Sequence, residues 1–151
     1  MTEAERRVRD SLTSIRRDSG AAMVLRSIAG RENAPAESVF KNIKIFQGVP
    51  AGRVVNIMNR GFGRSLGVSC GFCHVPGKWD LDDKPEKNTA RLMATMVQTI
   101  NRDYLAKIPE RAAPPGAPER SGPPTANCFT CHRGNPRPMA QEGPPPGPRT
   151  D

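Results

Sequence analysis

The sequence is poor in the residues that build a large protein core. Only 5% of its 151 residues are aromatic, including one Trp and one Tyr, and 36% are hydrophobic in total. A chain of this size and composition forms one modest domain with a small protein-only core. It also lacks any apolar run approaching the roughly 20 residues that a membrane-spanning helix requires. These shortages favour a single small domain with no transmembrane segment in the residues shown.

Cysteine and histidine are scarce as well, and their placement is the strongest signal in the chain. All four cysteines and both histidines fall in two copies of the pentapeptide C-x-x-C-H. This pattern is typical of covalent c-type haem attachment, because two thiols three positions apart lie on one face of a helical turn and the adjacent imidazole binds the iron. The sequence therefore predicts two covalently attached haem c groups. The predicted attachment residues are Cys70, Cys73, Cys128 and Cys131, and the predicted iron ligands are His74 and His132.

Two other uses of paired cysteines were weighed against haem. C-x-x-C pairs also build zinc ribbons, in which four ligands close a tetrahedral site. The gap from Cys73 to Cys128 is far longer than the usual ribbon loop of about 15 to 20 residues, and a ribbon gives no reason for a histidine after each pair. A disulfide framework also leaves the repeated histidines unexplained. Haem attachment is therefore the favoured interpretation, with zinc as the alternative.

Two haems would compensate for the small protein core. Each is a large apolar disc that a few short helices can enclose, so attached haem replaces packing that a bare chain would need. No strand-like alternation of apolar and polar residues is convincing. We expect an all-α fold, a small multihaem c-type cytochrome of short helices packed around two haems with irregular Pro/Gly-rich loops. We also expect a poorly folded apoprotein.

Composition divides the chain into three segments. Residues 1–36 form a charged, helical N-terminal extension, residues 37–138 form the diheme domain, and residues 139–151 form a proline-rich tail. The extension is either a docking or assembly arm or a helix that covers part of the haem domain. Prolines and glycines in residues 113–124 predict an extended loop that leads to the second motif.

Two helices are predicted inside the diheme domain. The first starts at Pro50 and ends among glycines up to Gly67, just before the first motif. The second starts at residues 83–86, which resemble a capping box with proline in the first turn, and ends at Pro109. Each carries one apolar stripe at helical spacing. The stripes are Val54, Val55, Met58 and Phe62 in the first helix, and Met93, Met96, Val97, Ile100 and Tyr104 in the second.

The distal haem ligands must come from another residue type, because both histidines are committed to the C-x-x-C-H motifs. Methionine is the natural substitute. We assign Met58 to the first haem, since its helix leads through a glycine turn into Cys70. For the second haem we assign Met96, with Met93 as the fallback. The alternative is that methionines on apolar stripes are ordinary core residues.

Several blocks of the sequence resemble the cytochrome c subunit family of photosynthetic reaction centres. The blocks span roughly residues 38–138 and are Gly67–His74, Asp83–Lys87, Met96–Asn101, Tyr104–Leu105 and Cys128–Gly134. The resemblance implies that Met58 and Met96 are distal haem ligands. The photosynthetic subunits typically carry four haems as two such pairs, one of them bound by two histidines. This chain has one pair and no further histidine, so it resembles half of such a subunit.

These observations predict an electron carrier rather than an enzyme. We expect single electrons to pass through two haems with His/Met ligation, because occupied sixth positions keep substrates off the iron. One alternative is a haem enzyme of the peroxidase or small-nitrogen reductase type with one open haem. Another is a haem-bearing subunit of a larger or polymeric assembly, which would include self-assembly of this chain.

Charge and export bear on the expected partners. The chain carries a formal +8 from 23 basic and 15 acidic residues, and about four haem propionates would roughly halve this excess. We expect redox partner proteins that are acidic or belong to a membrane-bound complex, although the basic surface is equally explained by solvation. Scattered basic residues argue against nucleic acid. Haem attachment to C-x-x-C-H predicts a periplasmic or extracellular location. Since no secretory signal is visible, we expect a mature or re-engineered form, or a true start that lies upstream.

Overall fold

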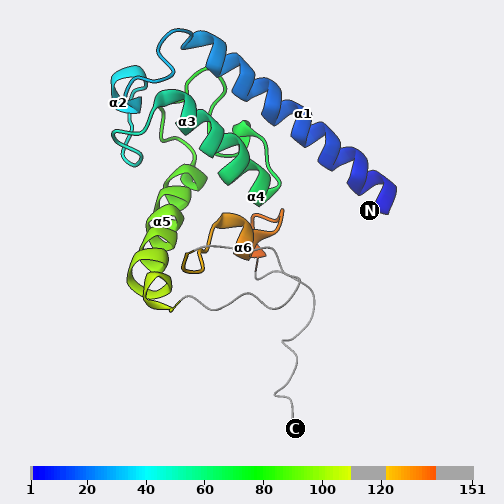
Figure 1. Ribbon diagram of the computed structural model, residues 1–151. Helices are drawn as coiled ribbons and strands as arrows, with labels where there is room; N and C mark the ends of the chain where they lie inside the picture. The colour runs from blue at the N-terminus through cyan, green and yellow to red at the C-terminus, as the bar shows by residue number, and fades with distance from the viewer. Residues whose placement is uncertain (1, 110–121, 139–151) are drawn as a thin grey trace.

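The protein is built from helices joined by irregular segments (Figure 1). The computed structural model describes residues 2–109 and 122–138, and within these ranges only two isolated bridges occur, with no named strand. The predicted all-α fold is therefore confirmed. No helix in the described ranges has both the length and the apolar character needed to cross a membrane. The predicted tail at 139–151 and most of the predicted loop at 113–124 lie outside the described residues.

Residues 1–36 contain one long helix, α1 (Glu3–Ser27), and the start of the short α2 (Ala36–Val39). The C-terminal half of α1 packs against α3, and together they bury a small cluster of Ala21, Ile28, Ala51 and Val55. The N-terminal half projects away from the other helices, as Figure 1 shows, and its Val8, Leu12 and Ile15 are exposed. One end of this segment therefore contributes to the core formed with α3, and the other stands free of that core.

The helix predicted to carry Met58 is present. It begins directly after Pro50 as α3 (Ala51–Asn56), widens into the π-helical segment η1 (Ile57–Gly63) and closes as α4 (Arg64–Leu66). It ends at Gly67, whose φ of +68° is in the left-handed region that glycine adopts at little cost. The predicted start and stop are both confirmed. The π-helical turn was not foreseen, and such turns are common at functional sites.

The second predicted helix is also present, but its predicted capping box is wrong. α5 (Pro85–Thr99) has Pro85 at its first position, as expected, whereas the N-cap is Lys84 and makes no side-chain cap bond. Because the helix begins there, its third position falls on Lys87 rather than Glu86, so Asp83 and Glu86 are out of register for reciprocal capping. The helical run continues through η3 (Ile100–Tyr104) and η4 (Leu105–Lys107) and stops before Pro109.

Both C-x-x-C-H motifs adopt helical turns. The first contains a 3-10 turn, η2 (Cys70–Phe72), and the second forms α6 (Cys128–His132), capped by the Asn127 side chain. The end of the second motif contacts α4, since the Gly134 amide donates to the Ser65 carbonyl at 2.8 Å. The helix that carries Met58 therefore leads into the first motif and contacts the second.

Candidate haem sites

The first motif borders a cavity of about 320 Å³. Cys70, Cys73 and His74 line it, and Met58 lines it from η1. The remaining apolar lining comes from α1, the segment after α2, α3, η1 and α4, and comprises Ala21, Val24, Ile43, Ile45, Val54, Val55, Phe62 and Leu66, among others. The fold thus gathers two thiols, an imidazole and a thioether around one largely apolar space. This is the donor set that a covalently attached, His/Met-ligated haem requires.

His74 is held in the tautomer that can bind iron. Its Nδ1 lies 3.0 Å from the Trp79 carbonyl oxygen, which can only accept, so Nδ1 carries the proton and Nε2 keeps its lone pair. The Trp79 ring packs edge-on against the imidazole at a centroid distance of 5.8 Å. Burial lowers the pKa of His74, and the charges of Lys87, Arg91 and Lys84 lower it further against the effect of the carbonyl bond. The imidazole is therefore neutral, as a metal ligand must be.

Both thiols of the first motif are partly buried, and the Cys70 thiol lies against α1. Burial raises the pKa of both Cys70 and Cys73, so they remain protonated at neutral pH. The Cys70 Sγ lies 3.8 Å from the Arg17 carbonyl, and a Cβ added at Gly20 would come within 3.0 Å of the same sulfur. Gly20 therefore lets the helix approach the attachment cysteine closely.

Arg17 is a residue of this site that the sequence did not reveal. It is 9% exposed and lines the cavity, and its guanidinium donates to the Asn59 side chain and to Ser14 Oγ, each at 2.9 Å. Its aliphatic stem passes so close to Gly63 that any side chain there would clash. The one signal in the sequence was the glycine at position 63, which leaves room beside the helix but does not indicate that the Arg17 side chain occupies that room.

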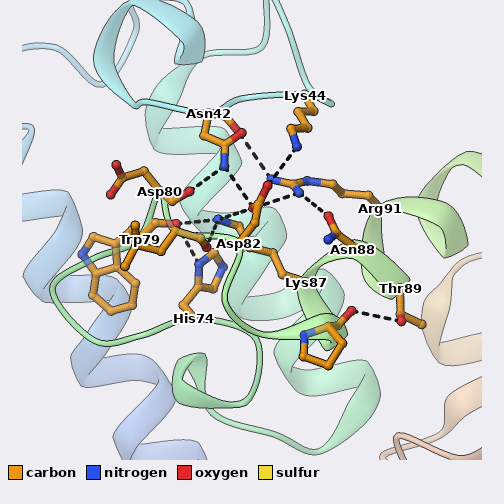
Figure 2. Close-up of polar contacts among 12 residues, drawn as sticks. Asn42, Lys44, His74, Trp79, Asp80, Asp82, Lys87, Asn88, Thr89 and Arg91 are labelled. Atoms are coloured by element: carbon orange, nitrogen blue, oxygen red, sulfur yellow. Dashed lines mark hydrogen bonds and ion pairs between the residues drawn. The ribbon is translucent and has the colours of Figure 1, made fainter.

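A cluster of charges lies along one side of the first cavity (Figure 2). The Asp82 carboxylate pairs with three cations, Lys44 at 2.8 Å, Arg91 at 3.0 Å and Lys87 at 3.2 Å. Hydrogen bonding, first from Lys44 and then from Asn42, Lys87 and Arg91, holds the pKa of Asp82 well below its usual range. All three cations also line the cavity. Their positive charge is suited to the anionic propionates of a haem.

A further lysine joins α5 to the first motif. The Lys84 ammonium donates to the Gly71 carbonyl, inside the C-x-x-C-H turn itself. Because Lys84 is the N-cap of α5, this bond fixes the start of the helix against the C-x-x-C-H turn. The block around Lys84 was identified from the sequence as a cap, and the structure assigns it this contact instead.

The second motif repeats the histidine geometry but not the enclosure. His132 Nδ1 donates to the Asn135 carbonyl at 2.8 Å, which again leaves Nε2 free to bind a metal. Burial raises the pKa of the Cys128 thiol, whereas Cys131 is exposed. Cys128 borders an open hollow of about 420 Å³ between α6 and the η1–α4 run, and its other lining residues are Arg60, Gly61, Arg64, Ser65, Asn127 and Phe129.

Asn101 fixes the chain just before the second motif. Its side-chain amide donates to the Ala126 carbonyl at 2.9 Å, and its side-chain oxygen accepts from the Ala126 amide at 2.7 Å. The C-terminal end of the α5 run is thereby joined to the segment that enters α6. In the sequence, Asn101 is only the last residue of the family-like block Met96–Asn101, and no local pattern indicates these two hydrogen bonds.

The methionines predicted for the second haem stand apart from its hollow. Met93 and Met96 are 41% and 46% exposed on α5, and neither lines the hollow beside Cys128 or the first cavity. Tyr104, predicted on the same stripe, is 66% exposed. The stripe therefore exists on α5 and η3, but part of it lies on the surface. Among the ligands predicted from the sequence, those of the first haem are brought together, and the second methionine is not.

The two motifs do not share one site. All four cysteines have free thiols. Within residues 2–109 and 122–138, no group of three His, Cys, Asp or Glu side chains is close enough to hold a metal ion. A closed zinc site formed jointly by the two pairs is thus not what this fold builds. Each motif instead offers its own thiol pair and imidazole, the donor set that fits one haem c each.

Comparison with known proteins gives a consistent picture. The sequence model of one family, described as photosynthetic reaction centre cytochrome C subunit, matches residues 51–142. The photosynthetic reaction center cytochrome c subunit of Thermochromatium tepidum is 30% identical over 118 residues, which cover 76% of this chain and 25% of that protein. The subunit of the same name from Roseobacter denitrificans is 36% identical over 89 residues, or 52% of this chain and 22% of that protein.

A relative with a different name also matches. Cytochrome c-554 of Chloroflexus aurantiacus is 24% identical over 95 residues, which cover 63% of this chain and 20% of that protein. The chain spans about a quarter or less of the length of these curated relatives. No solved structure matches it significantly.

Proposed function

The chain belongs to the photosynthetic reaction centre cytochrome c subunit family, and we therefore propose that it relays single electrons through two covalently attached haem c groups. The observation that carries the proposal is the repeated site geometry. In each motif two thiols accompany a histidine whose Nδ1 is bound to a backbone carbonyl, so that Nε2 is directed to a metal. The chain acts outside the cytoplasmic membrane, in the periplasm or extracellular space.

At the first site the chain's own residues perform most of the work. Cys70 and Cys73 would hold the haem covalently, and His74 and Met58 would supply the ligands of its iron. The bound haem supplies a reversible one-electron Fe(III)/Fe(II) couple. The apolar lining limits water, and Lys44, Lys87 and Arg91 neutralise the propionates. Met58 and His74 both line the cavity, which supports this pairing.

At the second site Cys128 and Cys131 would hold the haem, and His132 would supply one ligand of its iron. Met96 is the proposed distal ligand, with Met93 as the fallback. The Asn101 bonds to Ala126 support this placement, because they join the helix of Met96 to the segment that enters α6. Met96→Ala should convert one haem to a high-spin, carbon-monoxide-binding form, with Met93→Ala as the matched control. An unchanged spectrum in Met96→Ala rejects the ligand assignment.

The partners are proposed to be redox proteins that are acidic or part of a membrane-bound complex. The basic excess of the chain supports attraction to an acidic surface. Two relatives are named as subunits of photosynthetic reaction centers, and this supports association with a larger complex. The exposed end of α1 offers one place for such an association, or for assembly with further copies of this chain.

A haem count combined with a redox titration tests the proposal. The exported protein should carry two haems per chain, and both should titrate reversibly as one-electron couples in the optical spectrum. Fewer than two haems, or zinc in their place, contradicts it. The exposure of Met96 favours one competing function, an enzyme with an open second haem. Carbon monoxide decides between them, because a carrier with two low-spin haems ignores the gas and an open haem binds it.

A further inference from the structure

Lys87 is a buried cation with all its hydrogen-bonding capacity in use. It is 8% exposed, and its ammonium donates to the Trp79 carbonyl at 2.9 Å and the Leu81 carbonyl at 2.7 Å. Its third partner is the Asp82 carboxylate at 3.2 Å. An ammonium has three donors and a buried charge is stable only when partnered, so these contacts hold the positive charge at one fixed place.

That place is the carbonyl that orients the first iron ligand. The Trp79 oxygen accepts from His74 Nδ1 and from Lys87 Nζ together, as the dashed lines of Figure 2 show. The second site has a different arrangement. Among the described residues, the Asn135 carbonyl accepts from His132 Nδ1 with no lysine or arginine on the same oxygen. The two histidines therefore have the same type of partner, and only the first partner is shared with a cation.

We propose that Lys87 raises the reduction potential of the first haem relative to the second. A ligand imidazole becomes more electron-rich when its N–H donates to a strong acceptor, and this stabilises Fe(III). A cation bound to the same acceptor weakens that donation. The positive charge near the iron also favours Fe(II), the form with one more electron. Both effects act in the same direction, and the inference rests on the proposed attachment of a haem to this motif.

The charge of Lys87 is not cancelled by Asp82. Three cations meet this single carboxylate, so the protein's own groups in the cluster carry a net positive charge, which the propionates of a bound haem would offset without moving the charge of Lys87 from its place. Lys44 supplies a matched comparison within the cluster. It binds the same carboxylate at 2.8 Å, its side chain is 56% exposed, and its ammonium donates to Asp82 rather than to the Trp79 carbonyl. Lys87 and Lys44 thus differ in their contact with the histidine partner while sharing a charge and a counterion.

The test is a potentiometric titration of the haem-loaded protein, followed optically, for wild type and Lys87→Met. One couple should move to lower potential, with roughly a tenfold fall in its reduced-to-oxidised ratio at fixed ambient potential, equivalent to about 59 mV for one electron. The other couple should stay in place. A variant that keeps only the first motif, Cys128→Ala with Cys131→Ala, identifies the couple of the first haem.

Three further variants separate tuning from general damage. Lys87→Arg keeps the charge and should retain most of the wild-type potential, and Lys44→Met should shift it much less than Lys87→Met. Asp82→Asn should raise the potential, because it removes the compensating negative charge, whereas local unfolding would lower or broaden both. The inference is overturned if Lys87→Met leaves the first couple unmoved or shifts it no more than Lys44→Met. A first motif without bound haem, seen by mass analysis of its peptide, would instead contradict the proposed function.

Discussion

The two C-x-x-C-H motifs share their two cysteines, their histidine and the same histidine-to-carbonyl bond, yet their surroundings differ. The first lies beside a largely apolar cavity formed by several helices, with Met58 on its wall and a cation cluster along one side. The second lies on α6 at an open hollow, with Cys131 exposed and Met96 elsewhere on the surface. In the proposed function the pentapeptide supplies attachment and the proximal ligand, whereas the surrounding helices supply enclosure, charge and access. Changing one motif or its surroundings at a time separates these contributions.

The largest effect is expected from removing haem attachment at one site at a time. Cys70→Ala with Cys73→Ala should destabilise the haem-loaded protein by about 4 kcal/mol or more, because the proposed first haem would fill the cavity around which the helices pack. Cys128→Ala with Cys131→Ala should cost clearly less, since the hollow beside the second motif is open. Denaturant unfolding monitored by helical circular dichroism measures both. Equal losses would show that the two sites contribute equally to the core.

A second experiment disturbs the backbone contact between the end of α4 and the segment that follows the second motif. Gly67→Ala should cost roughly 2 to 4 kcal/mol, because a left-handed φ strains any other residue and the new Cβ would collide with the Gly134 carbonyl. The spectrum of the second haem should change more than that of the first, since Gly134 lies two residues after His132 of the second motif. Gly30→Ala is the control, because Gly30 has a φ of +82° with nothing within 4 Å of an added Cβ. If both variants lose the same stability, strain alone explains the effect and the contact between the sites is unimportant.

A third experiment loosens the second site alone. Asn101→Ala removes both bonds to the Ala126 backbone and should cost about 1 to 2 kcal/mol. The spectrum of the second haem should become more heterogeneous while that of the first is unchanged, as followed by magnetic circular dichroism. Gln98→Ala, an exposed position on the same helical run, serves as the control. A change in the first haem would mean that the end of α5 supports both sites.

The smallest effect concerns pH and the first site. Since the pKa of Asp82 is depressed in the folded protein, its contribution to stability is complete above its unfolded pKa of about 3.9 and is lost as the pH falls through the lower folded value. The stability difference between wild type and Asp82→Asn should therefore be constant above about pH 5 and shrink below about pH 4. Unfolding midpoints measured across this range give the curve, and Asp83→Asn controls for the loss of one negative charge. A difference that does not change with pH would exclude Asp82 as the titrating group.

Local pattern was sufficient for much of this architecture. The stripe containing Met58, its start after Pro50 and its end at Gly67 were predicted, because helix periodicity and glycine stops are encoded within a few neighbouring residues. The capping box at residues 83–86 was wrong, since the same letters fit two registers and only the position of Pro85 at the start of α5 chooses between them. Sequence reasoning therefore succeeded for element types and failed for one helix cap.

The contacts that distinguish the two sites were not predictable in this way. The bond from Arg17 to Asn59 joins residues 42 positions apart, and the bond from Asn101 to Ala126 joins residues 25 positions apart. In the sequence, Lys87 is only the last residue of the block Asp83–Lys87, and nothing local shows that Trp79 and Asp82 converge on it. Such contacts depend on how helices pack, and a single sequence does not state that packing.

We expect the first cavity to hold a haem whose iron His74 and Met58 both ligate. Counting the haems that bind carbon monoxide in the reduced, haem-loaded wild type and in Met58→Ala shows whether Met58 is that ligand. Met58→Ala should bind one more carbon monoxide per chain than wild type and should lose the sulfur-to-iron absorption band of the first haem. An unchanged count with an unchanged band would mean that the iron beside His74 takes its sixth ligand from another residue, and Met58 would then be rejected.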